Sequence, residues 1–205
     1  MSGNKLEQEV KFCLGSLSQL EERLQLLGAE LVQPRTYERN LRFDTPDRRL
    51  SNAFQVLRLR LDDRVRLTYK GAGDPGQEVS ARQEIEVTVS DLKAAREILE
   101  ALGFEVITVY EKYRAAYQLL NCEVSLDEMP FGHFCEIEGP DADSIQTCAL
   151  ALGLDWQVRS KLSYMALFAA LKERLGLAML DLTFEVFDGI QVTPESMGVV
   201  LADLD

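Results

Sequence analysis

This chain of 205 residues has a single histidine and no closely spaced cysteines. The histidine is His133, and it stands beside a predicted turn, where a structural or solvent-facing role is expected. The four cysteines lie far apart and form no C-x-x-C pair. This spacing disfavours a structural zinc site and indicates reduced, mostly packed thiols in a cytosolic protein.

Positive charge is also scarce. The 34 acidic side chains outnumber the 22 basic ones and give a net charge of −12. Such an excess argues against a surface that binds nucleic acid or anionic membranes. Cations that gather in one cavity would be hidden within this total.

The sequence shows no long apolar run and no export signal. No apolar run approaches the roughly 20 residues of a membrane span, and the N-terminus lacks the charged-then-apolar pattern of a signal peptide. We therefore expect a cytoplasmic protein that is neither exported nor membrane-spanning. The glycine-rich stretch 71–76 is predicted to be a surface loop, because it lacks the Lys-Ser/Thr pair and the following helix of a P-loop.

A hydrophobic fraction of 46% supports a proper core, and several stretches carry apolar residues at helical spacing. They predict amphipathic helices over 17–27, 91–102, 143–152 and 163–175. Ser18 is the expected cap of the first helix, and Asp143 or Ser144 that of the third. Two extended segments, 29–33 and 36–43, are predicted after the first helix.

Charged residues recur at every second position of several extended stretches. Glu7, Glu9 and Lys11 alternate with apolar residues, so in a β-strand they share one face. Two carboxylates and an ammonium in one row can hold a divalent metal and an anion together, although a polar face that meets water is ordinary for antiparallel sheets. The other rows are Arg58 and Arg60; Arg66, Thr68 and Lys70; Arg82, Glu84 and Glu86; Lys112 and Arg114; and Glu136 and Glu138.

Taken together, these rows favour a closed barrel over a flat sheet. Closing the strands gathers the charged groups in the lumen, and the amphipathic helices can then cover the apolar outer face. Unpaired charges withdrawn from water cost several kcal/mol each, so function is the simplest reason to build such a lumen. Cations there would meet the phosphates of a ligand, and carboxylates would meet its metal.

An ordered series of short motifs runs from residue 6 to about residue 170. It comprises the E-x-E-x-K of Glu7 to Lys11, Phe43-Asp44-Thr45, Leu57-Arg58-Leu59-Arg60, Leu67 to Gly71, Arg82 to Glu86, Lys112-Tyr113-Arg114, Leu126-Asp127 with Pro130 and Gly132, Phe134 to Glu138, and Lys161 before Ser163-Tyr164. In this series the chain resembles the CYTH superfamily, also called triphosphate tunnel metalloenzymes. That superfamily includes bacterial adenylyl cyclases, thiamine triphosphatases and inorganic triphosphatases.

The resemblance implies an α+β fold, in which an eight-stranded antiparallel β-barrel forms an open tunnel and amphipathic helices pack on its outside. Residues 1–176 would form the tunnel domain. Residues 177–205 would be an extension that packs on the same domain or on a partner subunit in a homodimer, with Asp203 and Asp205 solvated. The tunnel would bind triphosphate together with Mg²⁺ or Mn²⁺, as one ion or two.

Roles for individual residues also follow from the resemblance. The implied metal ligands, directly or through water, are Glu7, Glu9, Asp127, Glu136 and Glu138. Phosphate oxygens would be held by Lys11, Arg58, Arg60, Lys70, Arg114 and Lys161, with Arg82 and Lys112 as additions. Glu7, Glu9, Lys11 and Lys112 would be the catalytic residues. Glu84 and Glu86 would either orient the cations or join the metal shell.

Five further residues have open alternatives. Arg39 and Arg42 precede the Phe43-Asp44-Thr45 turn, and each is either a surface charge or a substrate contact. Tyr37, Tyr69 and Tyr164 are either aromatic packing residues or part of a site for a base or a thiazole ring.

Three functions fit this set of residues. The leading one is a metal-dependent triphosphatase that hydrolyses the terminal phosphate of tripolyphosphate, ATP or thiamine triphosphate, because phosphoryl transfer depends mainly on positioning and charge neutralisation. The second is an adenylate cyclase, in which the ribose 3′-oxygen of ATP attacks the α-phosphorus and pyrophosphate leaves. The third is a triphosphate- or polyphosphate-binding module without turnover. None of the three involves nucleic acid or a membrane.

Overall fold

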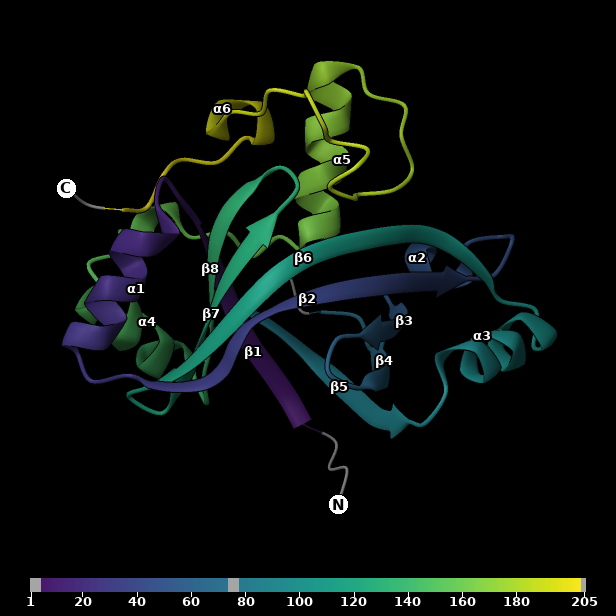
Figure 1. Ribbon diagram of the computed structural model, residues 1–205, viewed down its shortest axis with the longest axis horizontal. Helices are drawn as coiled ribbons and strands as arrows, with labels where there is room; N and C mark the ends of the chain where they lie inside the picture. The colour runs from purple at the N-terminus through teal and green to yellow at the C-terminus, as the bar shows by residue number, and fades with distance from the viewer. Residues whose placement is uncertain (1–4, 74–77, 204–205) are drawn as a thin grey trace.

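The computed structural model describes residues 5–73 and 78–203 (Figure 1). Residues 74–77, which include part of the predicted 71–76 loop, and Asp205 lie outside the described residues. The strands of the described part are β1 (Lys5–Leu14), β2 (Glu30–Asp44), β3 (Val56–Leu61), β4 (Val65–Lys70), β5 (Ser80–Val89), β6 (Glu105–Leu119), β7 (Cys122–Met129) and β8 (Gly132–Glu138).

These strands close into one antiparallel barrel in the order β1-β5-β4-β3-β2-β6-β7-β8. β1 completes the ring because its first half pairs with β5 and its second half with β8. Glu9 belongs to both halves, because it lies opposite Ser80 of β5 on one side and Glu138 of β8 on the other. The predicted α+β fold with an eight-stranded antiparallel barrel is therefore confirmed.

Six α-helices occur in the described residues. They are α1 (Leu17–Leu26), α2 (Arg49–Asn52), α3 (Leu92–Ala101), α4 (Ala142–Ala151), α5 (Tyr164–Leu175) and α6 (Pro194–Met197), with a short 3₁₀ turn at Trp156–Val158. The predicted caps of α1 and α4 were wrong: the Ser16 and Asp141 side chains accept the capping hydrogen bonds. None of these helices is long and apolar enough to cross a membrane.

β2 is one strand of 15 residues, not the two extended segments that the sequence predicts. Pro34 suggests a break at the sequence level because proline donates no backbone hydrogen bond. The barrel accommodates it at shifts of the β2–β6 register between Leu31 and Thr36. The strand therefore continues past the proline with a local irregularity.

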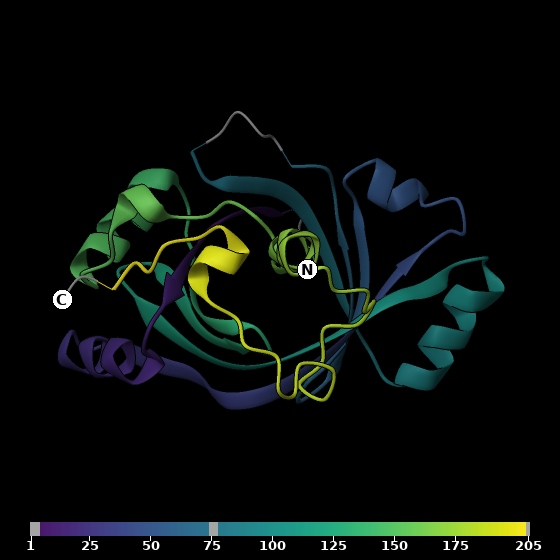
Figure 2. The same ribbon diagram turned by 90° about the horizontal axis from the view of Figure 1, so that it is seen from above.

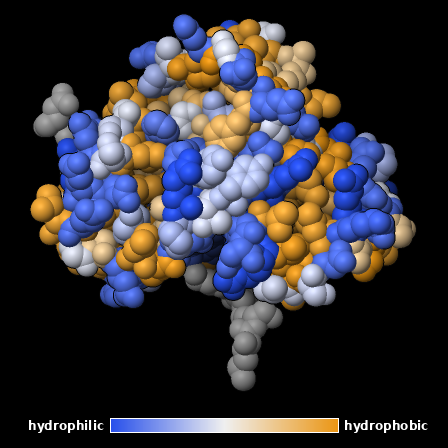
Figure 3. Space-filling view, viewed as in Figure 1, coloured by the Kyte–Doolittle hydropathy of each residue, from blue (hydrophilic) through white to orange (hydrophobic). Residues whose placement is uncertain are grey.

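The outer wall of the barrel carries two apolar cores. Val10, Phe12 and Ile137 on the outer faces of β1 and β8 are fully buried and pack in one cluster with Leu24 of α1 and Ile145 of α4. A smaller cluster joins β2 and β3 to α3. In Figure 1, α1 and α4 accordingly lie at one side of the barrel and α3 at the other. Hydrophilic and hydrophobic side chains are interspersed on the face seen there (Figure 3).

Helix α5 differs from the prediction that the helices pack on the outside. Its apolar residues Leu167 and Phe168 belong to one buried cluster with Cys13 and Phe134, which share the inner faces of β1 and β8 with Lys11 and Glu136 by strand alternation. Viewed from above, α5 is seen end-on near the middle of the molecule (Figure 2). Because the inner face turns apolar here, α5 packs against it and covers one end of the lumen.

The segment after α5 packs on the same barrel. The Leu182 N–H donates to the Val109 carbonyl at 2.8 Å, and the Leu182 carbonyl accepts from the Glu111 N–H at 2.9 Å. Near the end of the segment, the Asp203 carboxylate accepts hydrogen bonds from the Gly15 and Ser16 N–H groups at 2.9 and 3.1 Å. Asp203 is half-buried, so its carboxylate is bound to the backbone of the β1–α1 turn while still reaching solvent.

Asp44, at the end of β2, is a buried anchor for the turn that follows. Its carboxylate is 0% exposed and accepts from the N–H groups of Thr45, Leu50 and Ser51 and from the Ser51 hydroxyl. Burial raises the pKa of this carboxyl, but these hydrogen bonds outweigh burial and lower the pKa below its usual range.

Replacing Asp44 by Ala should lower the free energy of unfolding by about 2–4 kcal/mol at neutral pH, because four donors lose a charged acceptor. A depressed folded-state pKa stabilises above the unfolded-state pKa, so the wild type should lose this advantage as the pH falls below about 4. Urea unfolding at pH 7 and pH 3 measures the difference. A difference between the two proteins that stays constant with pH would contradict this role of Asp44.

Candidate functional site

A cavity of about 190 Å³ lies inside the barrel and receives side chains from all eight strands and from the start of α5. Its lining residues are Glu7, Glu9, Lys11, Arg42, Val56, Arg58, Arg60, Lys70, Arg82, Glu84, Tyr110, Lys112, Arg114, Glu123, Glu136, Glu138, Ser163, Tyr164 and Met165. Eight of these are cations and six are carboxylates. The cavity thus carries an excess of positive charge within a chain of net charge −12, which favours an anionic ligand.

Lys11 is the most enclosed cation of the cavity, with 3% exposure. Its ammonium pairs with Glu9 and lies 2.9 Å from the Glu136 carboxylate. Burial lowers the pKa of Lys11, but Glu136 and Glu9 outweigh burial and raise the pKa above its usual range. On the neighbouring wall, Lys70 pairs in the same way with Glu7 at 2.6 Å and Glu84 at 2.8 Å. Both lysines are therefore charged and held in place by carboxylates.

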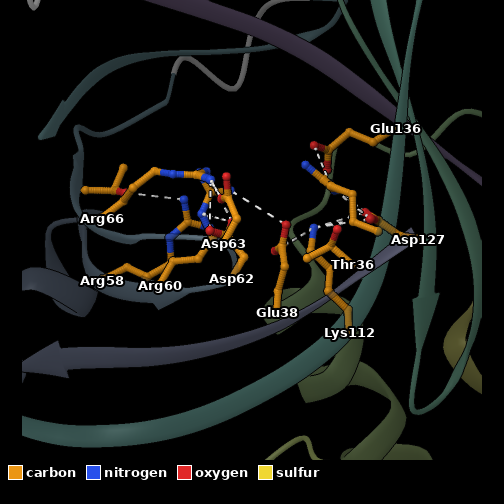
Figure 4. Close-up of polar contacts among 12 residues, drawn as sticks. Thr36, Glu38, Arg58, Arg60, Asp62, Asp63, Arg66, Lys112, Asp127 and Glu136 are labelled. Carbon is orange, nitrogen blue, oxygen red and sulfur yellow. Dashed lines mark hydrogen bonds and ion pairs between the residues drawn. The ribbon is translucent and has the colours of Figure 1, made fainter. Parts of the chain in front are cut away.

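Asp127 of β7 lies behind the lining and organises three groups that reach into the cavity. Its carboxylate is 0% exposed and accepts from Arg114 Nε at 2.6 Å, from Lys112 Nζ at 3.2 Å and from the Tyr164 hydroxyl at 2.6 Å. Figure 4 shows Asp127 and Lys112 close together. Burial, with Asp127 and Glu136 nearby, raises the pKa of Tyr164 well above its usual range. The hydroxyl consequently stays protonated and remains a hydrogen-bond donor.

The arginines of β3 are fixed by a neutral and an acidic partner on β6 and β5, each two strands away in the barrel. Arg58 Nη1 donates to the Tyr110 hydroxyl at 3.1 Å. Arg60 Nη2 lies 3.3 Å from the Glu86 carboxylate, which also accepts from the Thr68 hydroxyl at 2.8 Å. These contacts hold the guanidinium groups at the cavity wall and leave less side-chain freedom to be lost when an anion binds.

The structure brings together most of the site residues that the sequence predicts. Those that line the cavity are Glu7, Glu9, Lys11, Arg58, Arg60, Lys70, Arg82, Glu84, Lys112, Arg114, Glu136 and Glu138. Three others are not among the lining residues: Asp127 stands behind Arg114, Glu86 bonds to Thr68 and Arg60, and Lys161 is exposed. Lys161 lies just before α5 and outside any strand. The alternation of side chains in a strand therefore does not direct it into the barrel.

Sequence reasoning left Arg42 of β2 open between a surface charge and a substrate contact, and it missed Glu38 and Asn40 of the same strand. Arg42 lines the cavity, while Glu38 and Asn40 are buried four and two positions before it, on the same inner face. The sequence does show polar residues at every second position here, at 38, 40 and 42. Arg39 between them obscured this pattern, and strand alternation places Arg39 outside, where it is exposed. Tyr110 and Glu123 of the lining were also missed.

The cavity carboxylates have the donor chemistry that a hard divalent cation requires. Glu7, Glu9, Glu136 and Glu138 come from adjacent strands, with Glu9 directly opposite Glu138 and Lys11 opposite Glu136. Burial raises the pKa of Glu136, but Arg114, Lys11 and Lys112 outweigh burial and hold the pKa well below its usual range, so this carboxylate is ionised. Several of these oxygens contact lysine or arginine, and no three acidic, histidine or cysteine side chains in the described residues are grouped as a metal site. The residue types fit Mg²⁺ or Mn²⁺, while their oxygens in this structure are engaged in ion pairs with lysine.

Fold and cavity together define a small antiparallel β-barrel protein with a partly open, cation-rich lumen. The CYTH domain model matches residues 5–151. This chain belongs to the CYTH family, as its motifs predict.

Similar proteins carry several descriptions. "Putative adenylate cyclase MJ0240" of Methanocaldococcus jannaschii is 29% identical over 140 residues, which cover 67% of this chain and 79% of that protein. Among solved structures, a "putative adenylate cyclase" from Vibrio parahaemolyticus superimposes with a TM-score of 0.72 at 22% identity, covering 82% of this chain and all of that one. A Hippeastrum protein described as a "putative adenylyl cyclase" with "a dominant triphophatase activity" has a TM-score of 0.58 at 20% identity and covers 84% of this chain and 97% of that chain.

Proposed function

We propose that this protein is a metal-dependent triphosphatase that hydrolyses the terminal phosphate of a triphosphate held inside the barrel. The observation that carries the proposal is the convergence of eight cations, from strands far apart in the sequence, on one cavity. A triphosphate is a linear polyanion, and charge neutralisation along such a chain is the main demand of phosphoryl transfer. The Hippeastrum protein described above, which has the same fold, supports this reaction type.

The protein side chains would act by binding and orientation. Arg58, Arg60 and Lys112 would bind phosphate oxygens and neutralise the charge that develops on the transferred phosphoryl group. Lys11, held by Glu9 and Glu136, would orient the phosphate nearest β1. Arg58 and Arg60 are already held by Tyr110 and Glu86, so little reorganisation of these two arginines is needed when the substrate binds.

We also propose that Glu7, Glu9, Glu136 and Glu138 hold Mg²⁺ or Mn²⁺ in the substrate complex. A divalent cation would supply neutralisation of phosphate charge and a bound water of lowered pKa. The carboxylates now paired with Lys11 and Lys70 would share their oxygens with the cation. Those lysines would then turn toward the phosphates.

Adenylate cyclase is the second candidate, favoured by the description of the 29% identical relative. The size of the cavity favours the triphosphatase. At about 190 Å³ it is smaller than the roughly 300–1,000 Å³ of cavities that enclose drug-sized ligands. A cyclase must enclose the ribose beside the α-phosphorus, whereas a triphosphatase needs to enclose only the phosphate chain.

Incubation with tripolyphosphate, ATP and thiamine triphosphate in the presence of Mg²⁺ or Mn²⁺ tests the proposal. We expect orthophosphate and pyrophosphate from tripolyphosphate, and we expect excess EDTA to stop their release. Ion chromatography resolves the products. Cyclic AMP with pyrophosphate from ATP would instead establish the cyclase, and tight binding without any product would identify a binding module.

A further inference from the structure

The Glu38 carboxylate in β2 is buried without a hydrogen bond from any described residue. Its side chain is 1% exposed, and neither Oε1 nor Oε2 has a hydrogen-bond donor. Buried charges are ordinarily both paired and hydrogen-bonded, because removing them from water is costly. If this charge had no role, an apolar side chain at position 38 would make the fold more stable.

Two cations hold Glu38 in place at longer range. Lys112 Nζ lies 3.6 Å from one carboxylate oxygen, and Arg60 Nη1 lies 4.0 Å from the other. Burial raises the pKa of Glu38, but Lys112, Arg114 and Arg60 outweigh burial and keep the pKa below its usual range. Figure 4 shows Glu38 between two groups of charged side chains, one around Arg60 and the other around Lys112.

Glu38 connects cations that otherwise have separate partners. Lys112 pairs with Asp127, and Arg60 pairs with Glu86 and Asp62. Within the described residues, Glu38 is the carboxylate that lies within 4.0 Å of both cations. Both cations line the cavity, whereas Glu38 is not part of the lining and stands behind them. A bound phosphate therefore meets the cations first, and Glu38 acts through them.

We propose that Glu38 is a positioning residue that holds Arg60 and Lys112 aligned on the cavity wall and limits how tightly the cavity holds anions. This inference rests on the proposed function. It adds Glu38, which is in none of the sequence motifs described above, to the residues of the site. Two like charges left without the shared carboxylate repel and lose their alignment. The cavity also gains one positive charge, so it binds polyphosphate more tightly and releases the product more slowly.

The substitution Glu38→Gln keeps the size of the side chain and removes its charge. We expect its dissociation constant for tripolyphosphate, measured by titration calorimetry in EDTA without metal, to fall about tenfold, because a negative charge close to the ligand is lost in a low-dielectric site. With Mg²⁺, KM should fall as well, and kcat should fall about tenfold as the cations lose their alignment. A purely structural residue would alter thermal stability without this opposite movement of affinity and turnover.

Glu97→Gln is the matched control, because it removes the same charge from the exposed surface of α3, where Glu97 pairs with Lys93. We expect its affinity and kcat to equal those of the wild type. Equal tripolyphosphate affinity in Glu38→Gln and wild type would overturn this inference alone. Failure of the wild type to bind tripolyphosphate at all would overturn the proposed function.

Glu38→Asp provides a second test that does not depend on the folding of Glu38→Gln. It keeps the charge but withdraws the carboxylate from both cations. We expect an affinity for tripolyphosphate within about twofold of the wild type, because the net charge of the site is unchanged, together with a reduced kcat. An unchanged kcat in Glu38→Asp would show that alignment by Glu38 is not required.

Discussion

Replacing Glu9 by Gln should reduce metal-dependent turnover of tripolyphosphate at least about a hundredfold, since removal of one preorganised electrostatic group commonly costs 10²–10³ in kcat. Glu9 is 8% exposed, lines the cavity and pairs with Lys11. The substitution removes a proposed metal ligand and one of the two carboxylates that orient this lysine. Steady-state kinetics with Mg²⁺ or Mn²⁺ measure the loss.

The fold should survive the Glu9→Gln substitution. Lys11 keeps its contact with Glu136 at 2.9 Å, so no buried cation is left without a carboxylate. Glu128→Gln is a suitable control, because Glu128 pairs with Arg35, a side chain that is 54% exposed. That variant should retain full activity. Full turnover in Glu9→Gln would remove Glu9 from the site.

Replacing Arg114 by Met should have the largest effect on stability. The Arg114 guanidinium bonds to the fully buried Asp127 through two nitrogens and lies 2.9 Å from Glu136, which is 12% exposed. Removing one partner of a buried ion pair costs about 3–5 kcal/mol, and the loss here lies toward the lower end because Asp127 keeps Lys112 and Glu136 keeps Lys11. Denaturant unfolding should therefore show a clearly lowered midpoint, with activity lost as well.

Arg35→Met separates this effect from the loss of an arginine in general. Arg35 makes a comparable two-nitrogen contact with Glu128, but at the surface. Exposed ion pairs contribute about 0–1 kcal/mol, so its loss should barely change the midpoint. Similar midpoints for Arg114→Met and Arg35→Met would mean that the charge network in the barrel does not support the fold.

The alternating charges of the strands were enough to predict which side chains meet inside the barrel. In β1, Glu7, Glu9 and Lys11 share a face because strand geometry fixes alternate side chains on opposite sides. The alternation of charged and apolar residues was harder to recognise where an outward-facing residue was also charged. Arg39 has this effect in β2, so Glu38 was not recognised as an inner residue and Arg42 stayed open between a surface charge and a substrate contact.

The position of α5 could not be predicted from its sequence. An apolar helix face shows that the helix packs, but not on which surface it packs. Both the outer wall and the apolar end of the lumen can receive such a face. The choice depends on Cys13 and Phe134, which the barrel places at its inner surface next to Lys11 and Glu136. Likewise, Lys161 lies outside any strand, so alternation gives no direction for its side chain.

A crystal structure of the protein in complex with tripolyphosphate tests the central claim most directly. We predict that the phosphate chain lies inside the barrel, within hydrogen-bond distance of Arg58, Arg60 and Lys112. Tripolyphosphate bound on the outer surface, with the ion pairs of the cavity unchanged, would contradict the account.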